Sequence, residues 1–226
     1  MPPEIITLDI ETENTGYDIE KDNKRVISIQ LLDGTNGKLY YENAPYADLT
    51  VAKDRIIALM QAGDSFLGFN ISFDVRRIKE FLGVAIPSTQ IVEITELPAM
   101  EFVRQALQRR KPRLEEVCKV LEIPCTHKEI MTKRSDKFKQ LLHVIDKAKE
   151  GANKFQNERG WSYDFSYGYA LDKICGGMAI LDSFNEFVRT KGDTQTDFYK
   201  YAIGDIVTEK ELFLKLKGIE KNTTKT

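Results

Sequence analysis

The order of strand-like and helix-like segments sets the first limit on the fold of this 226-residue chain. Residues 4–10 form a short apolar run rich in β-branched side chains, which is typical of a buried strand. Two more strand-like runs follow at 25–32 and 37–42, and helical periodicity begins only at residue 49. Strands at the start of a chain with helices interleaved afterwards predict a mixed α/β domain.

The rest of the chain alternates between amphipathic helices and short apolar strands. Helices are expected at 49–61, 72–82, 100–108, 114–121, 136–152 and 197–216, and strands at 65–69 and 91–94. No repeat, low-complexity tract or Pro/Ser-rich linker divides the sequence. We therefore expect one domain over 1–226 that ends in a flexible polar tail at 219–226.

Composition and length exclude several classes of protein. With 42% hydrophobic residues and a net charge of only −2, the chain can bury a core, which excludes an intrinsically disordered protein. No apolar run approaches the roughly 20 residues of a membrane span, and the N-terminus lacks the charged and apolar regions of a signal peptide. Three scattered cysteines make no disulfide framework, so we expect a cytoplasmic protein without a membrane partner.

The small net charge conceals a strong asymmetry along the chain. Residues 1–103 carry 9 basic and 17 acidic side chains, a net charge of −8. Residues 104–159 carry 15 basic and 8 acidic side chains, a net charge of +7. Such an asymmetry indicates either a functional surface or two solvated helical faces.

An Asp-x-Glu-Thr sequence lies at the end of the first strand. Side chains two residues apart on a strand face the same side, so Asp9 and Glu11 project together, next to the apolar Leu8 and Ile10. Two like charges close to a core are costly unless a cation compensates them, and divalent cations prefer carboxylate oxygens. Taken alone, the pair is also compatible with two solvated acids at a strand end.

Two further motifs follow in order along the chain. Asn70-x-x-x-Asp74 spans the end of a later strand and the first turn of the next helix, where Asp74 also suits the helix N-terminus as a favourable charge. Tyr201-x-x-x-Asp205 places both side chains on one face of the last long helix. Each motif alone has an ordinary structural explanation, but the three together in this order are specific.

The three motifs resemble those of the DEDD superfamily of 3′–5′ exonucleases, and Tyr201 matches its DEDDy branch. Over about residues 4–125 and 195–216, the chain is similar to the proofreading exonuclease domain of family B DNA polymerases and to related DnaQ-like exonucleases. RNase D is a more distant relative with the same tyrosine. The resemblance implies a ribonuclease-H-like fold: a mixed five-stranded sheet flanked by helices, with a basic helical insertion between the second and third motifs.

The resemblance also implies a catalytic site. Its four carboxylates, which would hold two divalent metal ions (Mg²⁺ or Mn²⁺), correspond in this sequence to Asp9, Glu11, Asp74 and Asp205. Two such ions can clamp an in-line hydrolysis of a phosphodiester bond. Tyr201 would orient the attacking water, since a phenol with a pKa near 10 is a poor base at neutral pH.

Contacts with the substrate are implied in the same way. Thr12 and Asn70 would contact the terminal nucleotide, and Phe73 would stack on a base or pack in the core. Glu93 stands where related proteins often carry an aspartate after the second motif. It is therefore either an additional acid of the site or a plain acid on an edge strand.

Basic side chains gather in the insertion at 126–195, and a group of aromatic residues follows them. The aromatic residues are Trp161, Tyr163, Phe165, Tyr167 and Tyr169. Lysine and arginine neutralise phosphates, and aromatic rings stack on single-stranded bases. We expect Lys133, Arg134 and Lys137 to form a wall of a nucleic-acid groove, with a solvated lysine-rich helix as the alternative.

The two histidines, His127 and His143, stand near Cys125 without the ligand spacing of a zinc site, so we expect no zinc centre there.

The three motifs together predict a metal-dependent 3′–5′ exonuclease that removes nucleoside 5′-monophosphates from single-stranded or frayed DNA ends. Two alternatives stay open: an RNA 3′-end processing exonuclease similar to RNase D, and a non-catalytic nucleic-acid-binding module on the same fold. Proofreading or DNA repair would require a polymerase or repair partner, because the chain has no room for a polymerase domain.

Overall fold

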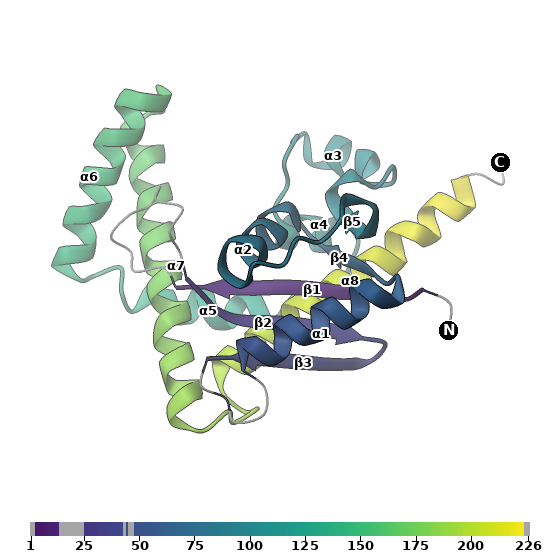
Figure 1. The fold of residues 1–226 in the computed structure, drawn as a ribbon. Helices are drawn as coiled ribbons and strands as arrows, with labels where there is room; N and C mark the ends of the chain where they lie inside the picture. The colour runs from purple at the N-terminus through teal and green to yellow at the C-terminus, as the bar shows by residue number, and fades with distance from the viewer. Residues whose placement is uncertain (1–2, 14–24, 43, 45–47, 224–226) are drawn as a thin grey trace. The chain divides into compact units, whose positions relative to one another are not determined.

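The computed structural model describes residues 3–13, 25–42, 44 and 48–223 (Figure 1). The chain divides into two compact units, which we call the sheet unit and the helical unit. The sheet unit comprises Met1–Glu11, Val26–Thr126 and Ala202–Thr226, and the helical unit comprises Thr12–Arg25 and His127–Tyr201.

Five strands in the spatial order β3-β2-β1-β4-β5 form the centre of the sheet unit. The strands are β1 (Ile5–Thr12), β2 (Val26–Asp33), β3 (Asn36–Tyr41), β4 (Ser65–Gly68) and β5 (Ile91–Glu93). β2 and β3 pair antiparallel, whereas β4 pairs parallel with both β1 and β5. The predicted mixed five-stranded sheet flanked by helices is confirmed.

The helices of the sheet unit begin and end close to the predicted positions. They are α1 (Leu49–Ala62), α2 (Ser72–Leu82), α3 (Met100–Leu107) and α4 (Leu114–Val120), with the 3₁₀ turns η1 (Ser88–Gln90) and η2 (Ile94–Glu96). Asp48 caps α1 by accepting the N–H of Val51, and glycines in the left-handed region end α1 and α2. The last helix, α8 (Asp197–Thr223), continues past the predicted end at residue 216 into the predicted tail.

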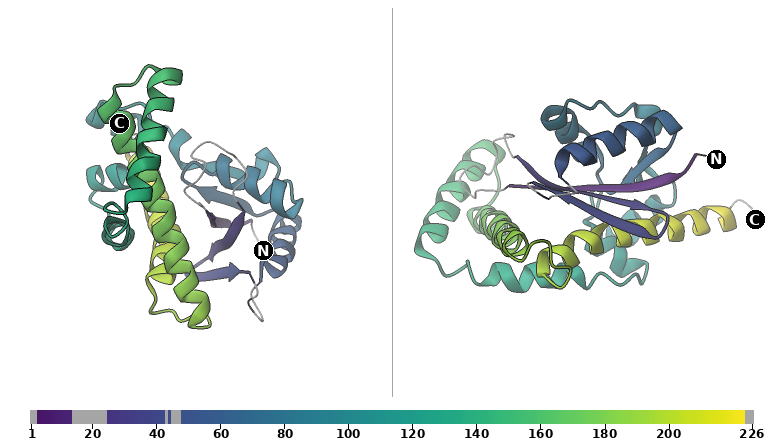
Figure 2. Two further views of the ribbon diagram at one scale, coloured as in Figure 1. Left: turned by 90° about the vertical axis from the view of Figure 1, so that its left-hand side faces the viewer. Right: turned by 60° about the horizontal axis from the view of Figure 1, so that its bottom comes forward.

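Successive side chains of the central strands point to opposite faces of the sheet, and both faces are apolar. On β1, the side chains of Ile6, Leu8 and Ile10 belong to the core that α1 and α2 cover. The opposite face packs against α3, α4 and α8, and Figure 2 shows α8 on the side of the sheet away from α1. Because Asp9 and Glu11 alternate with Leu8 and Ile10, both acids point to the face that carries α8.

The helical unit contains α5 (His127–Asp136), α6 (Leu142–Arg159) and α7 (Tyr163–Arg189). Its core consists of Val144, Ala148, Phe155, Ala170, Ile174 and Cys175, where α6 and α7 pack against each other. The predicted helix at 136–152 is wrong at its start, because α5 ends at Asp136 and a series of tight turns leads to Leu142. Leu142, the first residue of α6, is 78% exposed.

Helix α7 was not predicted, and it changes the interpretation of the aromatic residues. The ring of Trp161 lies 5.6 Å from Phe155 and 5.4 Å from Tyr169, measured between centroids. These rings pack within the helical unit, so Trp161 and Tyr169 are structural residues and not free platforms for bases. Phe165, by contrast, remains largely exposed.

Candidate metal centre

Three carboxylates come together beside the sheet, two from β1 near the start of the chain and one from α8 near its end. One oxygen each of Asp9, Glu11 and Asp205 lies within 4.8 Å of the others. Glu11 and Asp205 are buried and Asp9 is half-buried. Carboxylates held this close repel one another in a medium of low dielectric, and a hard divalent cation is the usual compensation. The triad could therefore hold a metal ion.

Asp74, in the first turn of α2, joins this cluster. It is 6% exposed, and its carboxyl group accepts the backbone N–H of Ile10, between Asp9 and Glu11 on β1. Burial, and then the charges of Asp9 and Glu93, raise the pKa of Asp74 well above its usual value. The predicted Asp9, Glu11, Asp74 and Asp205 are thus all neighbours in the sheet unit.

A fifth acid, Glu209, was not predicted. It lies one helical turn after Asp205 on α8 and is 4% exposed. Burial, followed by the charges of Asp9, Asp205 and Asp74, raises its pKa well above the usual value. The sequence contained a signal for it, because Glu209 continues the four-residue spacing of Tyr201 and Asp205.

Glu93 has a different role from the other acids. Its Oε1 atom accepts the backbone N–H of Asn70 at 2.9 Å, the N–H of Thr95 at 3.0 Å and the Thr95 hydroxyl at 2.8 Å. These bonds fix the turn between β4 and α2, in which Asn70 takes the left-handed conformation with φ of 62°. Glu93 therefore shapes the turn that presents Asp74.

Two of the three predicted contacts to the terminal nucleotide, Asn70 and Phe73, lie at the same turn. Asn70 is exposed, and Phe73 is 37% exposed at the start of α2, with the guanidinium of Arg77 5.4 Å from its ring centroid. Phe73 is accordingly a surface residue, and the alternative that placed it in the core is wrong. Thr12, the last residue of β1, is half-buried.

Tyr201 belongs to the helical unit and stands one turn before Asp205 on α8. The ammonium group of Lys128 donates to its hydroxyl oxygen at 3.2 Å and lies 4.7 Å from the ring centroid. His127 contributes a tilted ring at 6.2 Å. The tyrosine hydroxyl is thus oriented by a cation from α5.

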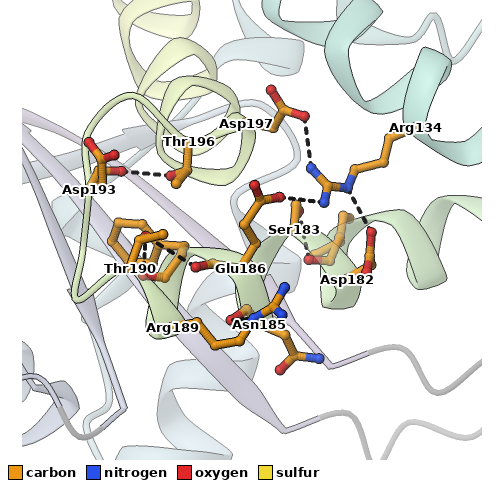
Figure 3. A network of polar contacts seen from close by, with 12 residues as sticks. Arg134, Asp182, Ser183, Asn185, Glu186, Arg189, Thr190, Asp193, Thr196 and Asp197 are labelled. Carbon is orange, nitrogen blue, oxygen red and sulfur yellow. Dashed lines mark hydrogen bonds and ion pairs between the residues drawn. The ribbon is translucent and has the colours of Figure 1, made fainter.

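Arg134 makes a set of ion pairs inside the helical unit (Figure 3). Its guanidinium, 11% exposed, lies 2.9 Å from Asp182, 2.5 Å from Glu186 and 2.8 Å from Asp197. A guanidinium that binds three carboxylates has little capacity left for a phosphate. We therefore assign Arg134 to the structure of the unit, in contrast to its predicted role, while Lys133 and Lys137 are exposed.

Within the described residues, no helix is long and apolar enough to cross a membrane. In comparisons with known proteins, no family model, no curated protein and no solved structure matched this chain. The function of the acidic cluster must therefore be inferred from its own residues and chemistry.

Proposed function

We propose that this protein is a metal-dependent 3′–5′ exonuclease of the DEDDy type on a ribonuclease-H-like fold. The observation that carries the proposal is the approach of Asp9, Glu11 and Asp205 to within 4.8 Å. These acids come from opposite ends of the sequence, and two of the three are buried. Acids that only face solvent do not have to be buried or to lie close together. A cation site in a protein requires carboxylates that are both close to one another and shielded from solvent.

The donor set suits Mg²⁺ or Mn²⁺. In the described part of the chain, the cluster consists of carboxylates alone, and hard cations prefer such oxygen donors. Asp9, Glu11 and Asp205 would hold one cation, and Asp74 together with Asp9 would hold a second. When bound, two such ions activate water at neutral pH and stabilise the leaving 3′ oxygen of a phosphodiester.

The other residues would act on water and on the nucleotide. The hydroxyl oxygen of Tyr201 accepts from Lys128, and its proton would be donated to the attacking water to orient it. Asn70 and Phe73 are exposed beside Asp74, where they would contact the terminal nucleotide together with Thr12. The exposed Lys133 and Lys137 would neutralise phosphates further along the strand.

The proposal is tested with 5′-labelled oligonucleotides, supplied as DNA or RNA and as single strands or duplexes, in Mg²⁺, Mn²⁺ or EDTA. We expect stepwise shortening from the 3′ end of single-stranded DNA, release of nucleoside 5′-monophosphates, and no reaction in EDTA. Asp9→Ala and Asp205→Ala should lower the rate at least about 10³-fold, an order of magnitude typical for loss of a metal ligand.

Asp146→Ala is a matched control, because Asp146 is an exposed aspartate of α6 whose ion pair within the described residues is with Lys149. It should behave like the wild type. Shortening of RNA in preference to DNA would favour the RNA-processing alternative. Binding without any cation-dependent cleavage, or equal cleavage by wild type and Asp9→Ala, would contradict the exonuclease proposal.

A further inference from the structure

Two buried oxygen atoms of the sheet unit have no hydrogen-bond partner within the described part of the chain. They are Oγ1 of Thr7 on β1 and Oε2 of Glu209 on α8. Thr7 is fully buried, and Glu209 is 4% exposed. Burying a polar group without a partner costs free energy, so both atoms require an explanation.

Contacts on either side show how α8 runs over β1. Near the end of β1, the carboxylate of Asp9 lies close to that of Asp205 on α8. At the start of β1, the side chain of Ile5 packs against the apolar cluster that includes Leu212. The carbonyl oxygen of Ile5 also accepts a hydrogen bond from the ammonium group of Lys210 at 2.9 Å. The helix therefore runs along the strand in the opposite direction.

The spacing along both elements puts Thr7 and Glu209 between these contacts. Four residues of strand span about 13 Å and seven residues of helix span about 10 Å, so the two elements advance together. Thr7 has the same orientation as Asp9, because side chains two residues apart on a strand share a face. Glu209 follows Asp205 by one turn on the buried side of α8. Both oxygen atoms thus lie in the layer between β1 and α8, directly beside the triad.

Glu209 stands behind the triad and not in it. It is not among the three residues whose oxygen atoms lie within 4.8 Å of one another. Its raised pKa, caused first by burial and then by the charges of Asp9, Asp205 and Asp74, agrees with a position close to these acids. An acceptor at this place suits the second coordination shell of a cation, where it would bind a water molecule that the cation carries.

We propose that Glu209, together with Thr7, is a further cation-binding residue: its Oε2 atom accepts a hydrogen bond from a water molecule on the cation held by the triad. This inference rests on the proposed function, because that function assigns a cation to the triad. Mg²⁺ usually keeps several waters in a protein site, and the Thr7 hydroxyl can donate to or accept from one of them. Outer-shell partners of this kind change metal affinity by about 10–100-fold.

The test measures two quantities on the full chain without nucleic acid: Mn²⁺ affinity by calorimetry, and the melting temperature in EDTA. Glu209→Met replaces the carboxyl group with an apolar side chain of similar length, and we expect the affinity to fall about 10-fold or more. The melting temperature in EDTA should stay at the wild-type value or rise, because the variant no longer buries an oxygen without a partner. Glu211→Met, at an exposed glutamate of the same helix, is the matched control and should equal the wild type in both quantities.

Thr7→Val keeps the inference testable if Glu209→Met does not fold. Valine has the shape of threonine without the hydroxyl, so the affinity should again fall about 10-fold, with no decrease of the melting temperature in EDTA. Wild-type affinity in Glu209→Met, or in Thr7→Val if only that variant folds, would overturn the inference. A loss of affinity that comes with a lower melting temperature in EDTA would also overturn it, because both residues would then serve the fold alone. Failure of the wild type to bind Mn²⁺ would overturn the proposed function as well.

Discussion

Backbone N–H groups hold the buried acids of the cluster in place. The carboxyl group of Asp74 accepts the N–H of Ile10, and the backbone N–H of Phe69 offsets part of the rise in the pKa of Glu209. Both donors lie close to the ends of the parallel strands β1 and β4. Hydrogen bonds from backbone N–H groups stabilise a carboxylate, so these strand ends offset part of the repulsion between neighbouring acids.

The first prediction concerns the hydroxyl group of Tyr201, which accepts from Lys128. Tyr201→Phe removes the hydroxyl and keeps the ring, so the attacking water loses its orientation. We expect the exonuclease rate to fall about 10²-fold, with Mn²⁺ affinity unchanged, because positioning effects of this kind reach that size. Single-turnover digestion and calorimetry measure the two quantities.

Tyr199→Phe is the control for this prediction. Tyr199 lies on the same helix, with its ring 6.3 Å from that of Phe187. Its hydroxyl has no place in the proposed mechanism, so the rate should stay at the wild-type value. A Tyr201→Phe enzyme as fast as Tyr199→Phe would show that the Tyr201 hydroxyl takes no part in the reaction.

Single residues of the site differ in how well the sequence predicted them. The period of two on β1 placed Asp9 and Glu11 on one face, and local helix geometry placed Tyr201 one turn before Asp205. The four-residue spacing would place Glu209 on the same face of α8 as Asp205, but its burial could not be predicted, because a glutamate on a helix usually faces solvent. Its burial results from the packing of α8 on the sheet, which is a tertiary effect.

At the level of elements, Arg134 joins α5 to α7 and to the first turn of α8. Arg134→Met would leave three carboxylates near one another without their shared cation. Each of these carboxylates is more than two-fifths exposed and can be rehydrated, so we expect the free energy of unfolding to fall by about 1–2 kcal/mol and not by the larger cost of a fully buried pair.

Urea unfolding followed by circular dichroism measures this change, and Lys133→Met supplies the comparison. Lys133 is the preceding residue on α5 and is exposed, so its replacement should cost less than about 0.5 kcal/mol. Equal stabilities of the two variants would show that the ion pairs of Arg134 contribute nothing to the unit.

Exposed lysines of α5 and the turn after it are expected to bind phosphates. Replacing both Lys133 and Lys137 with glutamate should weaken binding of a single-stranded oligonucleotide. The slope of log affinity against log salt should become shallower by about 0.7 for each phosphate that no longer pairs with a lysine. Lys215→Glu with Lys221→Glu, on α8, is the control. An unchanged slope in the first variant would exclude these lysines from the interface.

Prediction of elements succeeded in the sheet unit and failed in part of the helical unit. Strands and helices between residues 5 and 120 have apolar patterns with a clear period, bounded by glycine and turn residues. In α7, aromatic residues at 163, 165, 167 and 169 do not follow the helical period, and two consecutive glycines at 176 and 177 weaken the local helix propensity. Packing against α6 compensates for this, and such packing is invisible in a local pattern.

For the molecule as a whole, the buried acids couple stability to pH and to divalent cations. Asp74 and Glu209 have pKa values raised in the fold above the ordinary 3.8 and 4.5, with burial as the main cause. As pH rises through that range, the unfolded chain releases protons that the folded chain still binds. Without cations, these two groups therefore lower the free energy of unfolding as pH rises above about 4.

We accordingly expect the melting temperature in EDTA to decrease from about pH 5 to about pH 8, and to decrease less in Glu209→Gln, which has no proton to lose at that position. Mn²⁺ should raise the melting temperature of the wild type, and more at the higher pH, because the cation binds the ionised carboxylates of the folded state. Thermal unfolding of both proteins at several pH values, with and without Mn²⁺, measures these effects. Parallel pH curves for wild type and Glu209→Gln in EDTA would mean that Glu209 ionises in the fold as easily as in the unfolded chain, which its enclosure next to Asp9 and Asp205 argues against.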